Sequence, residues 1–165
     1  MPLLKGGRIV DDPWRPLDDD EAVPESGPVT VSLKRWTRER DALYRRHAPI
    51  GLRLPNDAAP TDLDRRDVER FELIALSFPR FTDGRGYSQA RVLRARLGYR
   101  GELRATGNVL RDQLLFMRRC GIDAFAVGDR AVVEDWLAAL REIDLFYQPA
   151  EDAHPWIARQ RALAR

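Results

Sequence analysis

From Val29 onward, short apolar runs alternate with segments of helical periodicity along the chain. The run 73–76 contains no polar residue, which indicates a strand that is covered on both faces. Strands that are separated by helices pair in parallel through crossover connections. The expected strands are Val29–Leu33, Ile50–Leu54, Leu73–Phe78, Glu102–Ala105, Ala124–Val127 and Leu145–Gln148.

The segments between these runs place apolar residues three and four positions apart, which is the spacing of an amphipathic helix. Asp129 is the expected N-cap of the helix at 131–143, and Gly121 stands where the preceding helix needs a left-handed C-cap. The expected helices are Trp36–His47, Thr61–Arg70, Ser88–Leu97, Leu110–Cys120 and Ala131–Ile143.

The last four expected strands start 29, 22 and 21 residues apart, which is the length of a strand–helix unit. We therefore predict an α/β fold with a parallel sheet of repeated strand–helix units. The arrangement is either an open doubly wound sheet or an incomplete (β/α) barrel, because the chain is too short for eight units. Residues 1–28 are expected to form a hairpin around Gly6-Gly7 and an irregular acidic connection. Residues 29–150 form the single α/β domain, and residues 151–165 form a helical tail.

The composition, with 44% hydrophobic and 33% charged residues, is that of a globular protein with a charged exterior. No apolar run reaches the roughly 18–20 residues that cross a bilayer, and the N-terminus lacks a secretory signal, so we expect a cytoplasmic protein without a membrane partner. One cysteine, Cys120, and two separated histidines predict no tightly bound metal and no iron–sulfur cluster. The net charge of +2 is too small to indicate a nucleic-acid partner.

The loop after the strand at 73–78 is the expected functional centre, since ligands of parallel α/β folds bind beyond the carboxyl ends of the strands. Gly84 and Gly86 permit positive φ, so their amides could turn toward one anion, and a helix is expected to begin near Ser88. Between residues 78 and 119 there are ten arginines and three acids. The candidate ligand-binding residues are Arg80, Asp83, Gly84, Arg85, Gly86, Ser88, Arg104, Asn108, Arg111 and Asp112.

These residues also have a structural explanation. The glycines can shape a tight connection, Ser88 and Asn108 can cap helices, and Asp83 can pair with a neighbouring arginine. The sequence Gly84-Arg85-Gly86 is not a dinucleotide fingerprint, because Gln89 stands where the third glycine belongs. We therefore expect no Rossmann-type nucleotide site.

Four blocks of the sequence resemble a bacterial domain-of-unknown-function family. The blocks are FPRFTDGRGYSQAR at 78–91, GELRA at 101–105, RDQ at 111–113 and RRCGIDAF at 118–125. Members of that family are often labelled as oxidoreductases of sulfite reduction, commonly because they are encoded beside sulfite reductase and other enzymes of sulfate assimilation. The resemblance covers about Leu52–Gln148. It implies a pathway, but the family has no established catalytic residues that could be assigned to positions of this chain.

The resemblance implies an accessory protein of assimilatory sulfite reduction, with sulfite reductase or another sulfate-assimilation enzyme as its partner. A small oxyanion such as sulfite would bind at the loop from Asp83 to Ser88. One alternative is an oxidoreductase of the same pathway with a dissociable cofactor, in which Asp83 would be the candidate acid or base. The other is a structural or regulatory module without catalysis.

Overall fold

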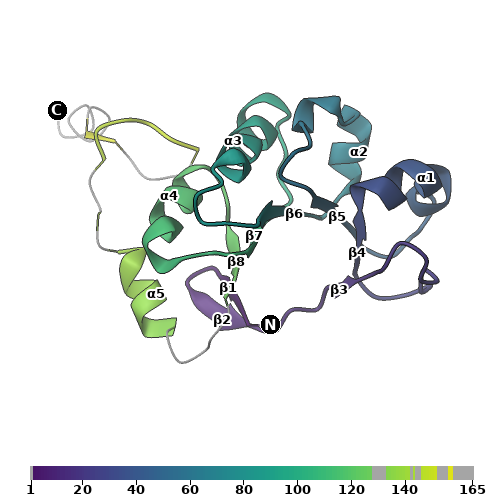
Figure 1. The fold of residues 1–165 in the computed structure, drawn as a ribbon, viewed down its shortest axis with the longest axis horizontal. Coiled ribbons are helices and arrows are strands. Elements are labelled where there is room, and N and C mark those ends of the chain that lie inside the picture. Colours follow the sequence, from purple (N-terminus) through teal and green to yellow (C-terminus); the bar gives the residue numbers. More distant parts are fainter. Residues whose placement is uncertain (1, 128–132, 142, 144–145, 152–155, 158–165) are drawn as a thin grey trace.

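The computed structural model describes residues 2–127, 133–141, 143, 146–151 and 156–157. Within these residues, eight strands form one sheet in the order β2-β1-β8-β7-β6-β5-β4-β3. The strands are β1 (Leu3–Lys5), β2 (Arg8–Val10), β3 (Arg15–Pro16), β4 (Val29–Ser32), β5 (Ile50–Leu54), β6 (Leu73–Phe78), β7 (Glu102–Gly107) and β8 (Ala124–Ala126). The sheet curls strongly, so that it forms a half-barrel with one open side (Figure 1).

The sheet is mixed. All neighbours from β3 to β8 pair in parallel, whereas β1 pairs antiparallel with both β2 and β8. The predicted α/β class is therefore confirmed, but the wholly parallel sheet is wrong, because the N-terminal hairpin adds two antiparallel strands beside β8. Of the two predicted arrangements, the incomplete barrel agrees with the curled sheet, and the doubly wound sheet is not observed.

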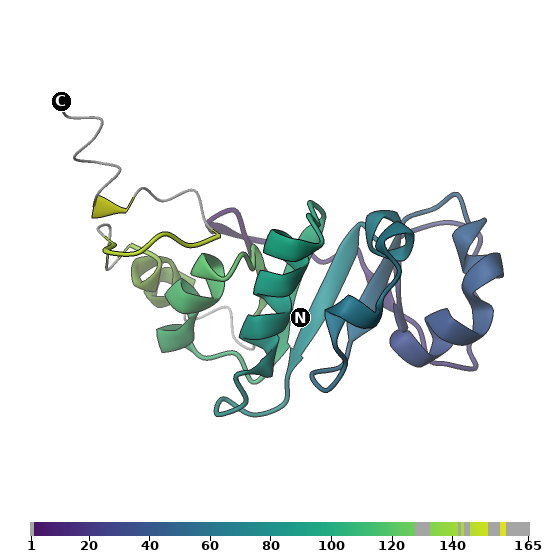
Figure 2. The ribbon, with the colours of Figure 1, turned by 90° about the horizontal axis from the view of Figure 1, so that it is seen from above.

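The helices cover the outer, convex face of the half-barrel (Figure 1). Seen from above, they lie side by side across the sheet, with α3 near the middle (Figure 2). The helices are α1 (Leu33–Tyr44), α2 (Arg65–Arg70), α3 (Arg85–Arg91), α4 (Leu114–Arg119) and α5 (Val133–Ala139), with a π-helical turn at Val92–Arg96 and 3₁₀ turns at Pro60–Asp62 and Arg111–Gln113. No helix in the described part of the chain is long and apolar enough to cross a membrane.

Because helices cover one face of the sheet, successive residues of each strand point to different surroundings. In β6, Ile74, Leu76 and Phe78 belong to the main core under the helices. Leu73 and Ala75 point to the concave side and are nevertheless buried. β6 is therefore covered on both faces, as predicted, although helices lie over its convex face alone (Figure 1).

Local sequence signals explain several element ends. Ser32 caps α1 by accepting a hydrogen bond from the backbone N–H of Arg35. Gly121 has φ of +96° directly after α4, as predicted for a left-handed C-cap. Among the described residues of the predicted strand at 145–148, Phe146 forms only an isolated bridge with Trp156. The expected N-cap at position 129 and most of the tail helix lie outside the described residues.

Helix α3 approaches β6 closely at Gly86, where a Cβ atom would lie 2.5 Å from Cζ of the buried Phe78 ring. We expect Gly86→Ala to lower the free energy of unfolding by about 1–3 kcal/mol through overpacking. Gly84→Ala is the matched control, because Gly84 has φ of −82° and its nearest foreign atom would be 3.8 Å away. Urea unfolding checks both, and equal losses would contradict the close approach at Gly86.

Candidate functional site

The segment between β2 and β3 crosses the open side of the half-barrel. β2 and β3 are the two edges of the sheet, and only residues 11–14 connect them. We call these four residues the strap. The strap runs from one edge of the sheet to the other, opposite the concave face (Figure 1), and a half-open space lies between the two.

This space is a cavity of about 810 Å³, which we call the concave cavity. Its wall combines strap residues with concave-side residues of β4 to β8, and most of it is apolar. The side chains that matter below are Trp14, Arg53, Leu73, Ala75, Arg104 and Ala126. Ligand sites typically have volumes of roughly 300–1,000 Å³, mainly apolar walls and a few polar groups. The concave cavity therefore has the size and character of a small-molecule site.

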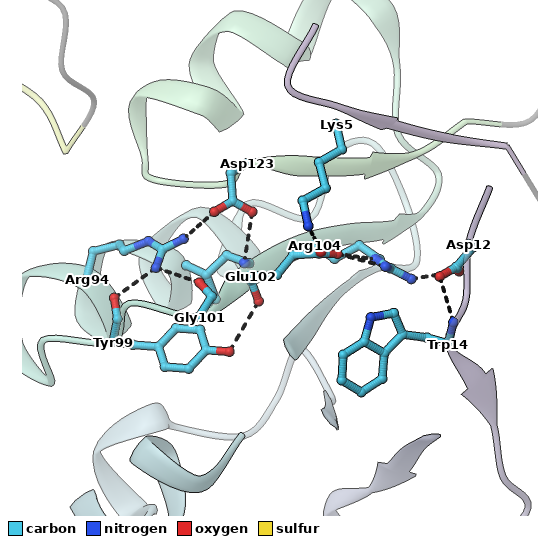
Figure 3. Close-up of polar contacts among 10 residues, drawn as sticks. Lys5, Asp12, Trp14, Arg94, Tyr99, Gly101, Glu102, Arg104 and Asp123 are labelled. Carbon is cyan, nitrogen blue, oxygen red and sulfur yellow. Dashed lines mark hydrogen bonds and ion pairs between the residues drawn. The ribbon is translucent and has the colours of Figure 1, made fainter. Parts of the chain in front are cut away.

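Arg104 lies at the centre of an ion-pair chain on the concave face (Figure 3). Its Nη1 donates to Asp12 Oδ2 of the strap at 2.7 Å, and its Nε donates to Glu102 Oε1 at 2.8 Å. Nη2 lies 2.7 Å from the same Glu102 oxygen, an ion pair at an angle unsuited to a hydrogen bond. Lys5 Nζ of β1 contacts the other Glu102 oxygen at 2.7 Å.

This chain links the strap to the sheet. The Arg104 side chain is only 6% exposed, so its charge has little contact with water. Removing one partner of a buried ion pair costs about 3–5 kcal/mol, because the other charge stays buried without compensation. Asp12 also accepts the backbone N–H of Trp14 at 3.1 Å, which fixes the strap's turn beside the cavity. Arg104 therefore acts first as the anchor of the strap.

Arg53 is a cation of the cavity wall that forms no salt bridge within the described residues, although its charge helps to lower the pKa of the nearby Asp19. It is the fourth residue of β5 and half-buried, and its Nη2 donates to the backbone carbonyl of Leu17. Among the described residues, Nε and Nη1 of Arg53 have no hydrogen-bond partner. A guanidinium group with two free donor positions beside apolar walls suits a bound anion.

The N-terminus of α1 also borders the concave cavity, but a carboxylate of the chain already occupies it. Ser32 Oγ donates to Asp19 Oδ1 at 2.5 Å, and Lys34 Nζ lies 4.0 Å from the other Asp19 oxygen. The hydrogen bond from Ser32 lowers the pKa of Asp19. Asp19 is thus ionised at neutral pH and satisfies this helix end from within the protein.

The predicted loop after β6 is organised around Asp83. Its Oδ1 accepts the backbone N–H and Nε of Arg85 at 3.2 and 2.9 Å, and its Oδ2 accepts Arg85 Nη2 at 2.6 Å. Asn56 donates a further hydrogen bond to Oδ2 at 2.5 Å. The side-chain hydrogen bond from Arg85 is the main reason that the pKa of Asp83 falls to about 2. The pairing of Asp83 with a neighbouring arginine is the structural explanation considered above.

The glycines of this loop do not have the predicted backbone conformation. Gly84 has φ of −82°, and Gly86 lies inside α3 without a positive φ, so the two amides do not form the expected turn. Ser88 is also inside α3 and is exposed, so its expected role as a cap is wrong. Arg80 is exposed beside them. Anion binding at this loop stays a prediction, and the Asp83 carboxylate already takes up the first free amide of the helix.

The second predicted cluster lies after β7. Asn108 donates its backbone N–H to the carbonyl of Phe78, and the following 3₁₀ turn has no side-chain cap, so the expected capping by Asn108 is wrong. Arg111 Nε donates to the backbone carbonyl of Asp135 in α5, and Asp112 is exposed. Among the predicted site residues, Arg104 alone contributes a side chain to the described wall of the concave cavity. Neither of the two predicted clusters borders it.

Two cavity residues were not predicted from the sequence. Arg53 interrupts the otherwise apolar strand 50–54, and this interruption was the available signal. Trp14 lies in the acidic, proline-rich connection, where the pattern indicates no regular structure and gives no sign that the segment crosses a sheet. In the part of the chain that the structure describes, no three His, Cys, Asp or Glu side chains gather as metal ligands would.

A family described as "Bacterial protein of unknown function (DUF934)" matches residues 51–157, which is well over half of the 165 residues. The chain belongs to the DUF934 family. Neither a curated protein nor a solved structure matches the chain significantly. The DUF934 match begins within β5 and includes Arg53, Arg104 and the Asp83 loop, whereas the strap and α1 precede it.

The Asp83–Arg85 pair makes a pH-dependent prediction for this DUF934 protein. The folded-state pKa of Asp83 is about 2, below the ordinary value of about 3.9. The pair therefore stabilises the fold above about pH 4, and this contribution is lost as the pH falls toward the folded-state pKa. In Arg85→Gln, the carboxyl midpoint should rise toward the ordinary value, as measured by ¹³C NMR. An unchanged midpoint would show that Arg85 is not the cause.

Proposed function

We propose that this DUF934 protein binds a small organic anion in the concave cavity, with Arg53 as the partner of the anionic group. The observation that carries the proposal is the guanidinium group of Arg53, which has two donor nitrogens without a partner among the described residues. The group lines a half-open space of about 810 Å³. Arg53 is half-buried and these two donors remain accessible to solvent, so an anion in the cavity can accept both as charge-assisted hydrogen bonds.

The cavity wall favours an organic anion over a bare inorganic ion. Leu73, Ala75 and Ala126 form an apolar floor, and Trp14 adds an indole ring from the strap. A single sulfite ion would fill only a small part of the volume and would make little contact with the apolar wall. A ligand with a flat apolar body and one anionic group would cover the floor and still reach Arg53. The anionic group can be a sulfonate, sulfate, phosphate or carboxylate.

We further propose that the protein serves assimilatory sulfite reduction as an accessory protein. The support is the resemblance of blocks 78–91 and 118–125 to proteins encoded beside sulfite reductase. The chain contains one cysteine, Cys120, which is buried. A pair of thiols within the chain therefore cannot reduce sulfite. An accessory role therefore fits the residues better than an oxidoreductase that uses its own thiols.

Binding of 1-naphthalenesulfonate tests the proposed cavity. Isothermal titration should show that Arg53→Gln weakens binding by about tenfold, the value of one charge-assisted hydrogen bond. The neutral 1-naphthalenemethanol should bind the variant and the wild type alike, because it lacks the charge. Arg66→Gln is the matched control, since Arg66 is exposed on α2 and outside the cavity wall. Equal affinity of the wild type and Arg53→Gln for the sulfonate would refute the assignment.

Growth of a deletion strain tests the pathway. The wild-type gene should restore growth on sulfate, and Arg53→Gln should restore it poorly although the variant protein is folded and abundant. Both strains should grow equally on cysteine, because cysteine bypasses sulfite reduction. A deletion strain that grows normally on sulfate would contradict the pathway but not the ligand site, which the titration tests separately.

A further inference from the structure

A second cleft lies away from the concave cavity, at the amino-terminal ends of β7 and β8. It has a volume of about 620 Å³ and shares no lining residue with the concave cavity. Its walls are the β1–β2 turn at Gly6-Gly7, the turn before β8 and the end of α5. Four arginines and two acids line it, namely Arg94, Arg100, Arg118, Arg141, Asp123 and Glu151.

One of the four arginines is fully used by the fold. Arg94 Nε donates to the carbonyl of Gly121 at 2.9 Å. Its Nη1 donates to the carbonyls of Tyr99 and Gly101 at 2.8 and 2.9 Å (Figure 3). Its Nη2 pairs with Asp123 Oδ2 at 2.8 Å. This arginine ties three turns together and has its charge compensated, so it does not supply a free cation to the cleft.

The other three arginines have no such partners. Within the described residues, the side chains of Arg100, Arg118 and Arg141 make no hydrogen bond and no ion pair. Three guanidinium groups in one cleft repel one another, and among the described lining residues Glu151 is the acid that remains to offset them. The structure thus gathers uncompensated positive charge at a concave place, which an anion would neutralise.

Stabilisation of cations at helix C-termini does not explain why all three arginines lie in this cleft. Arg118 lies in the last turn of α4, where a cation is stabilised by the free carbonyl groups. Arg100 belongs to no helix, and Arg141 follows the end of α5. The helix dipole therefore accounts for one of the three arginines.

We propose that this cleft binds the phosphate or sulfate group of a small organic ester between Arg100, Arg118 and Arg141. Guanidinium groups offer paired N–H donors that match the oxygens of such groups. The ester part is assigned because Leu137 of α5, Leu140 just after α5 and Ile122 form an apolar side of the same cleft. The cleft is also larger than one oxyanion requires. This site is independent of the anion proposed for the concave cavity.

Phenyl phosphate and phenyl sulfate are the probes, with inorganic phosphate for comparison, titrated into the full chain at constant ionic strength. Phenyl phosphate should bind more tightly than inorganic phosphate, because its ring contacts the apolar side. The comparison of the two esters distinguishes a phosphate site from a sulfate site. Each of Arg100→Gln, Arg118→Gln and Arg141→Gln should weaken ester binding by about tenfold.

The unliganded variants separate a binding role from a structural one. If the arginines bind a ligand, their removal relieves repulsion, and the melting temperature at low salt should stay the same or rise. Arg53→Gln and Arg66→Gln are the controls and should bind the ester like the wild type. The proposal is overturned if the wild type binds no ester at millimolar concentrations, if the three variants bind like the wild type, or if Arg53→Gln abolishes binding.

Discussion

The ion pair between Asp12 and Arg104 holds the strap across the mouth of the half-barrel, and the rest of the concave side depends on it. Five peptide links join the last residue of β2 to the first residue of β3, and they can span roughly 18 Å at most. The strap therefore limits how far the two edges of the sheet can separate. Glu102 and Lys5 continue the pair across β7 and β1, so one chain of charges ties the strap to the sheet.

A closed (β/α) barrel fills its interior with layers of large branched side chains. This half-barrel does not, because small residues such as Ala75, Ser77 and Ala126 stand on the concave side. Their small volume leaves space between the sheet and the strap, and the strap forms one side of that space. The cavity is thus a result of incomplete closure combined with small side chains, and Arg53 gives it an anion-binding group.

Periodicity was sufficient to predict much of the fold. β5 and β6 have the predicted bounds, and the C-cap glycine at 121 has its predicted conformation, because these signals are local. The docking of the N-terminal hairpin beside β8 could not be predicted, since antiparallel pairing at a sheet edge leaves no mark on the spacing of the strands. Likewise, the residues around Asp12 in the sequence give no sign that its partner is Arg104, because that contact exists only after the sheet has curled.

In the candidate site, too, local features could be predicted from the sequence and contacts between distant segments could not. The rule that ligands bind beyond the carboxyl ends of parallel strands led to the Asp83 loop, where the chain supplies its own anion to the helix start. Arg104 was among the predicted residues, but its partner Asp12 comes from the N-terminal segment. Arg53 was missed because a single charged residue in an apolar strand carries no spacing signal.

The ends of the sheet have a consequence for the protein in a crowded solution. β2 contains three residues and β3 only two, one of which is Pro16, which cannot donate a backbone hydrogen bond. Long exposed edge strands recruit strands from other molecules and start aggregation. Here a curled sheet that never closes ends in strands too short to act as templates, so the protein can keep an open barrel without the usual risk of edge-to-edge association.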